Sequence, residues 1–416
     1  MFFKTLFRPL IRATRGFKDP GAFLALFVAI FVTMTGLGFM VPLLPLYATK
    51  MGASGVETGG IFSIFSLPRL ICIPLFGYLM DRLSAKKLLA SGLFLFALLS
   101  YGYLKARNPG QLIAVRFAHG FASAMVIPVA IAIAGRLAGK KRESSSMAIF
   151  NVAIFMGFAF GPFIGGRLAD SYDFQAPFIA MGVMSLISFL TVVLFLPGGK
   201  IGDKKQGDVR REENTSFLGA LCDPDLFGVL LCRLVGAIGR SGLTVFLSVY
   251  AAEAFGASKT QVGDMIGASV FMTGILQVPF GYLADRVKRE HQVVCGAILF
   301  GFTLLLIPLA PNFAFLMAVA ILAGVMGAVA MPAQSGICVI VGRRHGMGTV
   351  MGLYTGMMSG GMLVGPMIGG AIKDGFGMPY VFAFAATAQL LGALLYGILL
   401  RRRHKKANRQ KMPAER

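Results

Sequence analysis

The sequence predicts an all-α membrane protein with twelve transmembrane helices, arranged as two parallel six-helix repeats. Three observations predict this class. Hydrophobic residues make up 56% of the 416 residues and charged residues only 14%, a composition that would expose large apolar patches in a soluble domain. Apolar runs of the ~20 residues that a spanning helix needs recur along the chain. A compact charged loop between two such runs also occurs twice.

The repeat has a constant offset of 204 residues. The loop GYLMDRLSAKK at 77–87 returns as GYLADRVKREH at 281–291. The same offset joins Gly120 to Gly324, Pro128 to Pro332 and GPFIGG at Gly161 to GPMIGG at Gly365. Because six spans, an even number, separate the copies, both have the same orientation. This is the parallel repeat whose axis lies along the membrane normal.

Each element follows from the apolar runs and the polar segments between them. The first repeat is expected to have helices at 21–47, 57–79, 87–104, 110–135, 146–169 and 176–197. The second is expected to have them at 225–252, 261–283, 292–310, 313–341, 347–372 and 379–400. The domains expected are an amphipathic cytoplasmic segment at 1–20, six-helix bundles at 21–197 and 225–400, a cytoplasmic linker at 198–224 and a basic cytoplasmic tail at 401–416.

The net charge of +22 comes from an uneven distribution of basic residues. With the N-terminus inside, 30 of the 40 Lys and Arg fall in cytoplasmic tails and loops, which is the positive-inside bias of an inner-membrane protein. No soluble basic fold presents these charges, so nucleic-acid binding is not expected. The five cysteines lack metal or redox spacing, and we expect no metal and no cofactor.

Glycine and proline mark candidate hinge and packing positions. In the first helix these are Gly36, Gly38, Pro42 and Pro45. In the fifth helix they are Gly157, Gly161, Pro162, Gly165 and Gly166, with Gly361, Gly365 and Pro366 in the second copy. Glycines at a spacing of four let another backbone approach closely, and prolines inside a membrane helix allow a bend. Ordinary helix packing is the alternative interpretation.

Charged and polar groups inside the spans are the candidate substrate and proton path. Charge at membrane depth is expensive unless it faces a cavity or a partner. The candidates are Arg69, Arg116, His119, Arg240, Gln277 and Gln334. Arg116 and His119 share a helix face, and His119 can take a proton near physiological pH. No Asp or Glu is expected at comparable depth, so a neutral, zwitterionic or anionic substrate is favoured over a lipophilic cation. The alternative is that Arg69 and Arg240 are structural.

These motifs resemble those of the major facilitator superfamily, over essentially the whole chain apart from its tails. The family's loop motif is matched by Gly77, Leu79, Asp81, Arg82 and Lys86, with Ser84 where Gly is usual. The second copy keeps Gly281, Leu283, Asp285 and Arg286. The resemblance implies the major facilitator fold and a gating role for these loops, with Asp81 near the start of the helix at 347–372. A turn with solvated charges is the alternative.

The resemblance is closest to the twelve-helix drug and proton antiporters. The glycines of the fifth helix resemble the antiporter motif, and the fourth-helix arginine of the family, here Arg116, is linked to proton transfer. His119 replaces the more usual Gln. We therefore expect proton-coupled efflux of a small amphipathic molecule by alternating access, in a protein that works as a monomer among membrane lipids. Uptake or facilitated transport of a metabolite or organic anion, and lipid flipping, are the alternatives; an enzyme is not expected.

Overall fold

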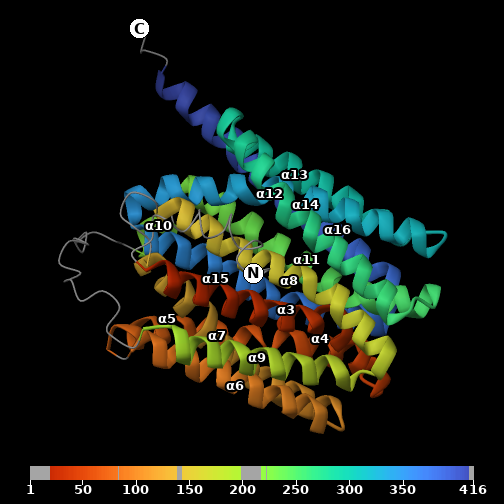
Figure 1. The fold of residues 1–416 in the computed structure, drawn as a ribbon. Helices are drawn as coiled ribbons and strands as arrows, with labels where there is room; N and C mark the ends of the chain where they lie inside the picture. Colours follow the sequence, from red (N-terminus) through yellow and green to blue (C-terminus); the bar gives the residue numbers. More distant parts are fainter. Residues whose placement is uncertain (1–18, 83, 138–142, 198–216, 222, 412–416) are drawn as a thin grey trace, which may run out of the picture. The chain divides into compact units, whose positions relative to one another are not determined.

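The computed structural model describes residues 19–82, 84–137, 143–197, 217–221 and 223–411. Nearly all of the expected N-terminal segment, most of the linker and the end of the tail lie outside these residues. Within the described residues the chain is helical and has no strand (Figure 1), which confirms the predicted all-α class.

The helices follow one another with short connections. The first group is α3 (Pro20–Lys50), α4 (Gly55–Ser63), α5 (Ser66–Arg82), α6 (Ala85–Lys105), α7 (Pro109–Leu137), α8 (Glu143–Tyr172) and α9 (Gln175–Phe195). The second is α10 (Phe217–Leu221), α11 (Pro224–Phe255), α12 (Lys259–Arg286), α13 (Arg289–Leu305), α14 (Phe313–His345), α15 (Met347–Phe376) and α16 (Met378–Lys411).

Among the described residues, ten helical stretches are long and apolar enough to cross a membrane. The protein is therefore an integral, multi-pass membrane protein. The single helix expected at 57–79 is instead α4 and α5, with a turn at Ile64 and Phe65. Pro68 explains the interruption, because it has no backbone N–H to donate to the carbonyl of Ile64, and proline is tolerated in the first turn of a helix.

The chain forms two compact units, and each unit contains a segment from the other sequence half. Unit 1 comprises 1–51, 67–205 and 258–267, and unit 2 comprises 52–66, 206–257 and 268–416. The exchanged segments contain α4 and the start of α12, which occupy equivalent places in the repeat. A left-handed glycine precedes each of them, Gly52 at φ +82° and Gly256 at φ +61°. Only glycine adopts this conformation without steric cost.

Within unit 1, α3 packs against α8 and α9, and buried apolar side chains fill the interior. Phe23 and Phe150 meet edge to face, with ring centroids 6.5 Å apart. Within unit 2, α11 packs against α15 and α16. Lipid is as apolar as these side chains, so close packing, rather than removal from water, holds such helices together.

Candidate functional site

A buried polar group lies in unit 1 around His119 of α7. The His119 side chain is 0% exposed, and its Nδ1 lies 2.9 Å from the Tyr103 hydroxyl of α6. The Phe96 ring meets the imidazole edge to face, with centroids 4.5 Å apart. One turn earlier, Arg116 is 7% exposed and contacts Met40 Sδ of α3 at 3.9 Å. A titratable imidazole is thus enclosed beside a permanent cation.

The other path residues predicted from sequence divide between the units. Arg69 lies on α5 in unit 1, half-buried and within electrostatic range of Arg116. Arg240, Gln277 and Gln334 belong to unit 2. Three of the six candidates therefore lie in each unit.

In unit 2, Arg240 and Gln334 have neutral partners. The Arg240 guanidinium lies over the Phe300 ring, 4.4 Å from its centroid, and its Nη2 is 3.5 Å from the Gly327 carbonyl. The Tyr354 hydroxyl donates to the Gln334 carbonyl at 3.1 Å. These side chains come from α11, α13, α14 and α15.

Glycines of α8 lie directly against the backbone of α3 in unit 1. A Cβ atom at Gly161 would lie 2.5 Å from the Gly38 Cα, and one at Gly157 would lie 2.5 Å from the Phe31 carbonyl oxygen. A Cβ at Gly165 would lie 3.0 Å from Phe39. Gly36 faces Met181 of α9, Pro42 and Pro45 are inside α3, and Pro162 is inside α8. At Gly157 and Gly161 no larger residue fits without separating the helices.

The equivalent glycines of α15 lie against α11 in unit 2. A Cβ at Gly361 would lie 2.5 Å from the Ala237 Cβ, and one at Gly365 would lie 2.2 Å from the Ile238 carbonyl oxygen. Pro366 is inside α15. Both repeats therefore use glycine at equivalent positions for a backbone-to-backbone contact.

The charged loops are described only in part. The structure describes the backbone of Gly77, Asp81 and Arg82 in α5 but not their surroundings, so the expected contact of Asp81 stays a prediction. Lys86 donates to the Val193 carbonyl at 2.8 Å and to the Leu196 carbonyl, at the end of α9. A cation is favourable there, because unpaired carbonyls give a helix C-terminus a partial negative charge.

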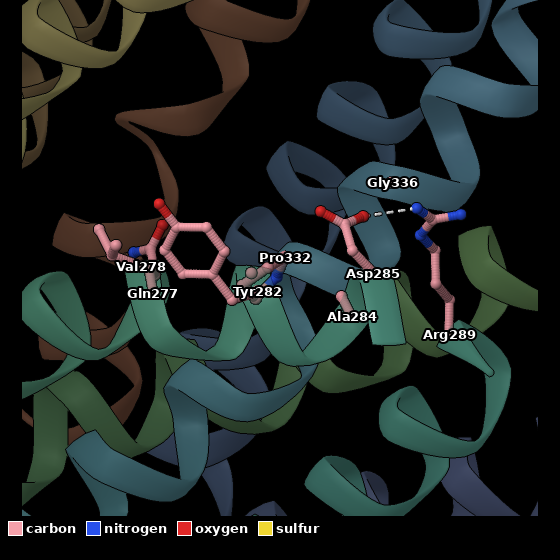
Figure 2. Close-up of a pocket in the computed structure, with 9 residues that line it drawn as sticks. Gln277, Val278, Tyr282, Ala284, Asp285, Arg289, Pro332 and Gly336 are labelled. Atoms are coloured by element: carbon pink, nitrogen blue, oxygen red, sulfur yellow. Dashed lines mark hydrogen bonds and ion pairs between the residues drawn. The ribbon is translucent and has the colours of Figure 1, made fainter. Parts of the chain in front are cut away.

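The second loop borders a hollow of about 360 Å³ in unit 2 (Figure 2). Asp285, near the end of α12, accepts from Arg289, the first residue of α13, at 2.7 Å, whereas Arg286 is exposed. Gln277, Gly281, Tyr282 and Pro332 are among the other lining residues. Figure 2 shows the Gln277 and Tyr282 side chains on α12, the helix that also carries Asp285.

Two carboxylates that sequence reasoning missed cap the exchanged segments. Asp374 of α15 accepts from the backbone N–H of Gly55 at 2.7 Å and of Val56 at 2.9 Å, at the start of α4. Asp170 of α8 accepts from the N–H of Lys259 at 3.2 Å and of Thr260 at 2.7 Å, at the start of α12.

The sequence carried a signal for this pair. Both copies read Gly-Pro-x-Ile-Gly-Gly followed by an Asp four residues after the last glycine, at the constant offset of 204. The amides that they bind, at the start of α4 and at the start of α12, have the same offset. An acidic residue repeated with the glycines therefore identified the capping position.

The charge of the described interior is positive or neutral. Its buried polar and charged side chains are Thr, Ser, Gln, Arg116 and His119, with no buried Asp or Glu among the described residues. No group of three or more His, Cys, Asp or Glu side chains in the described part of the chain is arranged to hold a metal. The functional groups that the described interior offers are thus an imidazole, guanidinium groups and side-chain amides.

Comparison with known proteins agrees with this organisation. A bacterial homologue of the human lysosomal transporter Spinster, solved in an inward-facing and occupied conformation, superimposes with a TM-score of 0.77 at 14% identity, over 92% of this chain and 98% of that one. The MFS-type transporter MJ1560 of Methanocaldococcus jannaschii is 27% identical over 89% of this chain and 96% of its own. Multidrug resistance protein 2 of Bacillus subtilis is 24% identical over 89% of this chain and 93% of its own.

The family model agrees with the repeat as well as with the fold. The model of the Major Facilitator Superfamily matches twice, over residues 26–228 and 229–415. The two matches together cover nearly the whole chain, and their boundary falls close to the end of the linker predicted from the sequence. This protein belongs to the Major Facilitator Superfamily.

Proposed function

We propose that this transporter exports a small amphipathic molecule in exchange for protons, by alternating access between its two repeats. The observation that carries the proposal is the enclosed group of His119, Tyr103 and Arg116 within a member of a transporter family. An imidazole can gain and lose a proton. The adjacent guanidinium disfavours the protonated form, so proton binding would depend on a nearby anion or on water in the cavity. Multidrug resistance protein 2, which aligns over most of the chain, supports efflux of an amphipathic molecule.

Alternating access would use the close helix contacts inside each unit, where neighbouring helices can shift against each other. The glycines of α8 and α15 bring backbones together without interlocking side chains, so these contacts can form and separate at low steric cost. We assign gating to the loop residues Gly77, Asp81, Arg82 and Lys86 and to Gly281, Asp285 and Arg286. We assign hinge and packing roles to the glycines and prolines of α3, α8 and α15.

The substrate would be neutral, zwitterionic or anionic. A transporter of permanent cations needs a countercharge in a dry site, and the described interior has buried Arg116 and no buried carboxylate. Arg69, Arg240, Gln277 and Gln334 are the further residues that we assign to the path. We place the protein in the inner membrane as a monomer with both termini cytoplasmic, in agreement with the excess of basic residues in its expected cytoplasmic segments.

Proteoliposomes with an imposed pH gradient test the proposal. Purified protein is screened against drugs, organic anions and sugars, with Arg116→Ala and His119→Gln as the test variants. Arg107→Ala is the matched control, because that arginine is exposed and lies between α6 and α7. Flux should require the gradient, fail in both test variants and persist in the control.

Two results would contradict the proposal. Flux that persists after the pH gradient is abolished would show facilitated transport instead of antiport. Efflux of a permanently cationic dye that survives both Arg116→Ala and Arg240→Ala would contradict the substrate class.

A further inference from the structure

Two arginines of unit 2 lie on the same side of α11. Arg233 and Arg240 are seven residues apart, which places them on one face of the helix and about 10 Å apart along its axis. Both are within the candidate span 226–255, and both are partly buried. The sequence placed Arg240 in the substrate path but gave Arg233 no role.

The guanidinium carbon of each arginine lies over an aromatic ring of a neighbouring helix. The Arg233 Cζ is 4.6 Å from the centroid of Tyr354 on α15, and the Arg240 Cζ is 4.4 Å from the centroid of Phe300 on α13. In a cation–π contact the guanidinium can place its flat face against the ring. The N–H groups around its edge stay available for hydrogen bonds in the guanidinium plane.

The hydrogen-bond partners of these edges are neutral and poor. Arg233 Nη2 contacts Met358 Sδ, a weak acceptor, at 2.7 Å, and Arg240 Nη2 contacts the Gly327 carbonyl at 3.5 Å. The buried Arg233 Nε has no hydrogen-bond partner among the described residues. Neither arginine takes part in any ion pair of the described residues. Two cations at this depth are costly without an anion.

The surrounding side chains are arranged to hold the two guanidiniums in place. A Cβ atom at position 327 would come within 2.9 Å of the Arg240 guanidinium, so glycine there leaves room for it. The Tyr354 hydroxyl is bonded to Gln334, whose amide also contacts Cys232 Sγ at 3.8 Å. These bonds fix the ring on which Arg233 lies.

The fold of a repeat does not itself need arginine at these positions. The residues at the same offset in the first repeat are Ala29 and Gly36, in α3. Because α3 forms the equivalent helix with small residues, the two charges of α11 serve something other than helix formation.

We propose that Arg233 and Arg240 form a binding site for the anionic group of an amphipathic ligand, such as a carboxylate, sulfonate or phosphate. The edges of the stacked guanidiniums would donate to its oxygens, in the geometry that favours arginine for such groups. Nearby apolar side chains, among them Phe300 and Met358, would contact its apolar part. The inference extends the proposed function, because it names the charge of the cargo.

Thermal unfolding of the purified full-length protein in a non-ionic detergent tests the site. The probes share one chain and differ in their headgroup: 1-decanesulfonate, 1-decanol and decyltrimethylammonium. The variants are Arg233→Gln, Arg240→Gln and both together, with Arg343→Gln as the matched control because Arg343 is exposed at the end of α14. A sulfonate stays ionised at every working pH, so protonation cannot explain a difference.

The wild type should unfold at a higher temperature with decanesulfonate than with either other probe. The apparent affinity for decanesulfonate, taken from the concentration dependence of the unfolding temperature, should fall about tenfold in each single variant. The preference for the sulfonate should disappear in the double variant and persist in Arg343→Gln. An equal response to the three headgroups, or a sulfonate preference that survives in the double variant, would overturn the proposal. The response to decanol reports whether each variant still binds an apolar chain. A variant that no longer responds to decanol is replaced by Arg233→Lys or Arg240→Lys. These lysine variants should keep part of the sulfonate preference.

This measurement uses no pH gradient, so its failure differs from failure of the proposed function. If the wild type shows gradient-driven flux but no sulfonate preference, the protein is an antiporter without this anion site. A sulfonate preference in a protein that shows no gradient-driven flux would leave the anion site and contradict antiport.

Discussion

At the start of α4 two backbone amides donate to Asp374, and at the start of α12 two backbone amides donate to Asp170. The middles of the repeats have no such agreement. Arg116 and His119 correspond to Ala320 and Ala323 at the same offset. The repeats are therefore alike at the exchanged segments, α4 and the start of α12, and different where the interior carries charge.

The physical requirements of the two regions explain this difference. The contacts of the exchanged segments depend on close backbone spacing. A Cβ at Gly59 would lie 2.1 Å from the Pro366 carbonyl oxygen, and one at Gly263 would lie 2.3 Å from the Pro162 carbonyl oxygen. The same close backbone spacing therefore requires glycine at equivalent positions of both repeats. The proposed anion site and the proposed proton site each need their chemistry in one repeat only, so the mid-span residues are free to diverge.

Adding a methyl group where the exchanged segments pack should have the largest effect on stability. Gly59→Ala and Gly263→Ala each place a methyl group against a carbonyl oxygen, and should lower the free energy of unfolding by about 1–3 kcal/mol. Gly352→Ala is the control, because nothing lies within 4 Å of its added Cβ. There alanine should be neutral or stabilising by about 0.5–1 kcal/mol. Thermal unfolding in detergent measures this, and unequal losses at Gly59 and Gly263 would break the comparison.

One equivalent pair of positions has a positive φ angle in both repeats but different residues. Gly377 has φ +97°, and Asp173, at the same offset, has φ +85°. Gly377→Ala should cost about 1–3 kcal/mol, because Gly377 also has ψ 170° and a Cβ is unfavourable in that region. Asp173→Gly should be nearly neutral, since relief of that conformation offsets the lost contacts of Asp173 with Lys50 and Lys259. Equal losses of unfolding temperature in the two variants would contradict this expectation.

Removal of either capping carboxylate should loosen only the helix that it caps. Asp374→Ala should speed hydrogen exchange at the amides of Gly55 and Val56, and Asp170→Ala should do so at Lys259 and Thr260. Each loss should cost about 0.5–2 kcal/mol, the range for a helix cap. Exchange followed by mass spectrometry makes each variant the control for the other. Faster exchange at both sites in one variant would show that the caps are not independent.

The polar group of unit 1 should respond to a change that the second repeat cannot reproduce. Tyr103→Phe removes the hydroxyl bonded to His119, and should cost about 0.5–1.5 kcal/mol. It should also move the pH profile of gradient-driven flux, since the imidazole loses a fixed partner. Tyr101→Phe is the control, because Tyr101 is exposed on the same helix. An unchanged profile in Tyr103→Phe would separate His119 from proton coupling.

The smallest effect concerns Asp173, which lies between α8 and α9. The backbone N–H of Phe174 lowers the pKa of its carboxyl, with smaller contributions from Lys50 and Lys259, against the opposing effect of burial. A carboxyl with a lowered folded-state pKa stabilises the protein above its unfolded value of about 3.9, and this stabilisation is lost as the pH falls through the folded value. Asp173→Asn should flatten the fall in unfolding temperature below about pH 4. An unchanged slope would show that other carboxyls dominate acid unfolding.

The sequence determined the class of fold and the repeat, because both depend on local chemistry. Apolar runs of membrane length can only become helices when lipid offers no partner for the backbone. The matched glycines and prolines fixed the offset of 204 without any coordinates. Arg116 and His119 were recognisable for the same reason, since a polar group in an apolar run carries its own cost.

Only the tertiary structure decided which distant residues meet. The contacts of Asp374 with Gly55, of Arg233 with Tyr354 and of His119 with Tyr103 join different helices, and helical periodicity gives a face but no partner. The division of 57–79 into α4 and α5, and the exchange of α4 into unit 2, were also absent from the pattern. The physical reason is that burial and capping depend on distances between segments, whereas hydrophobicity along a chain records only what each segment prefers.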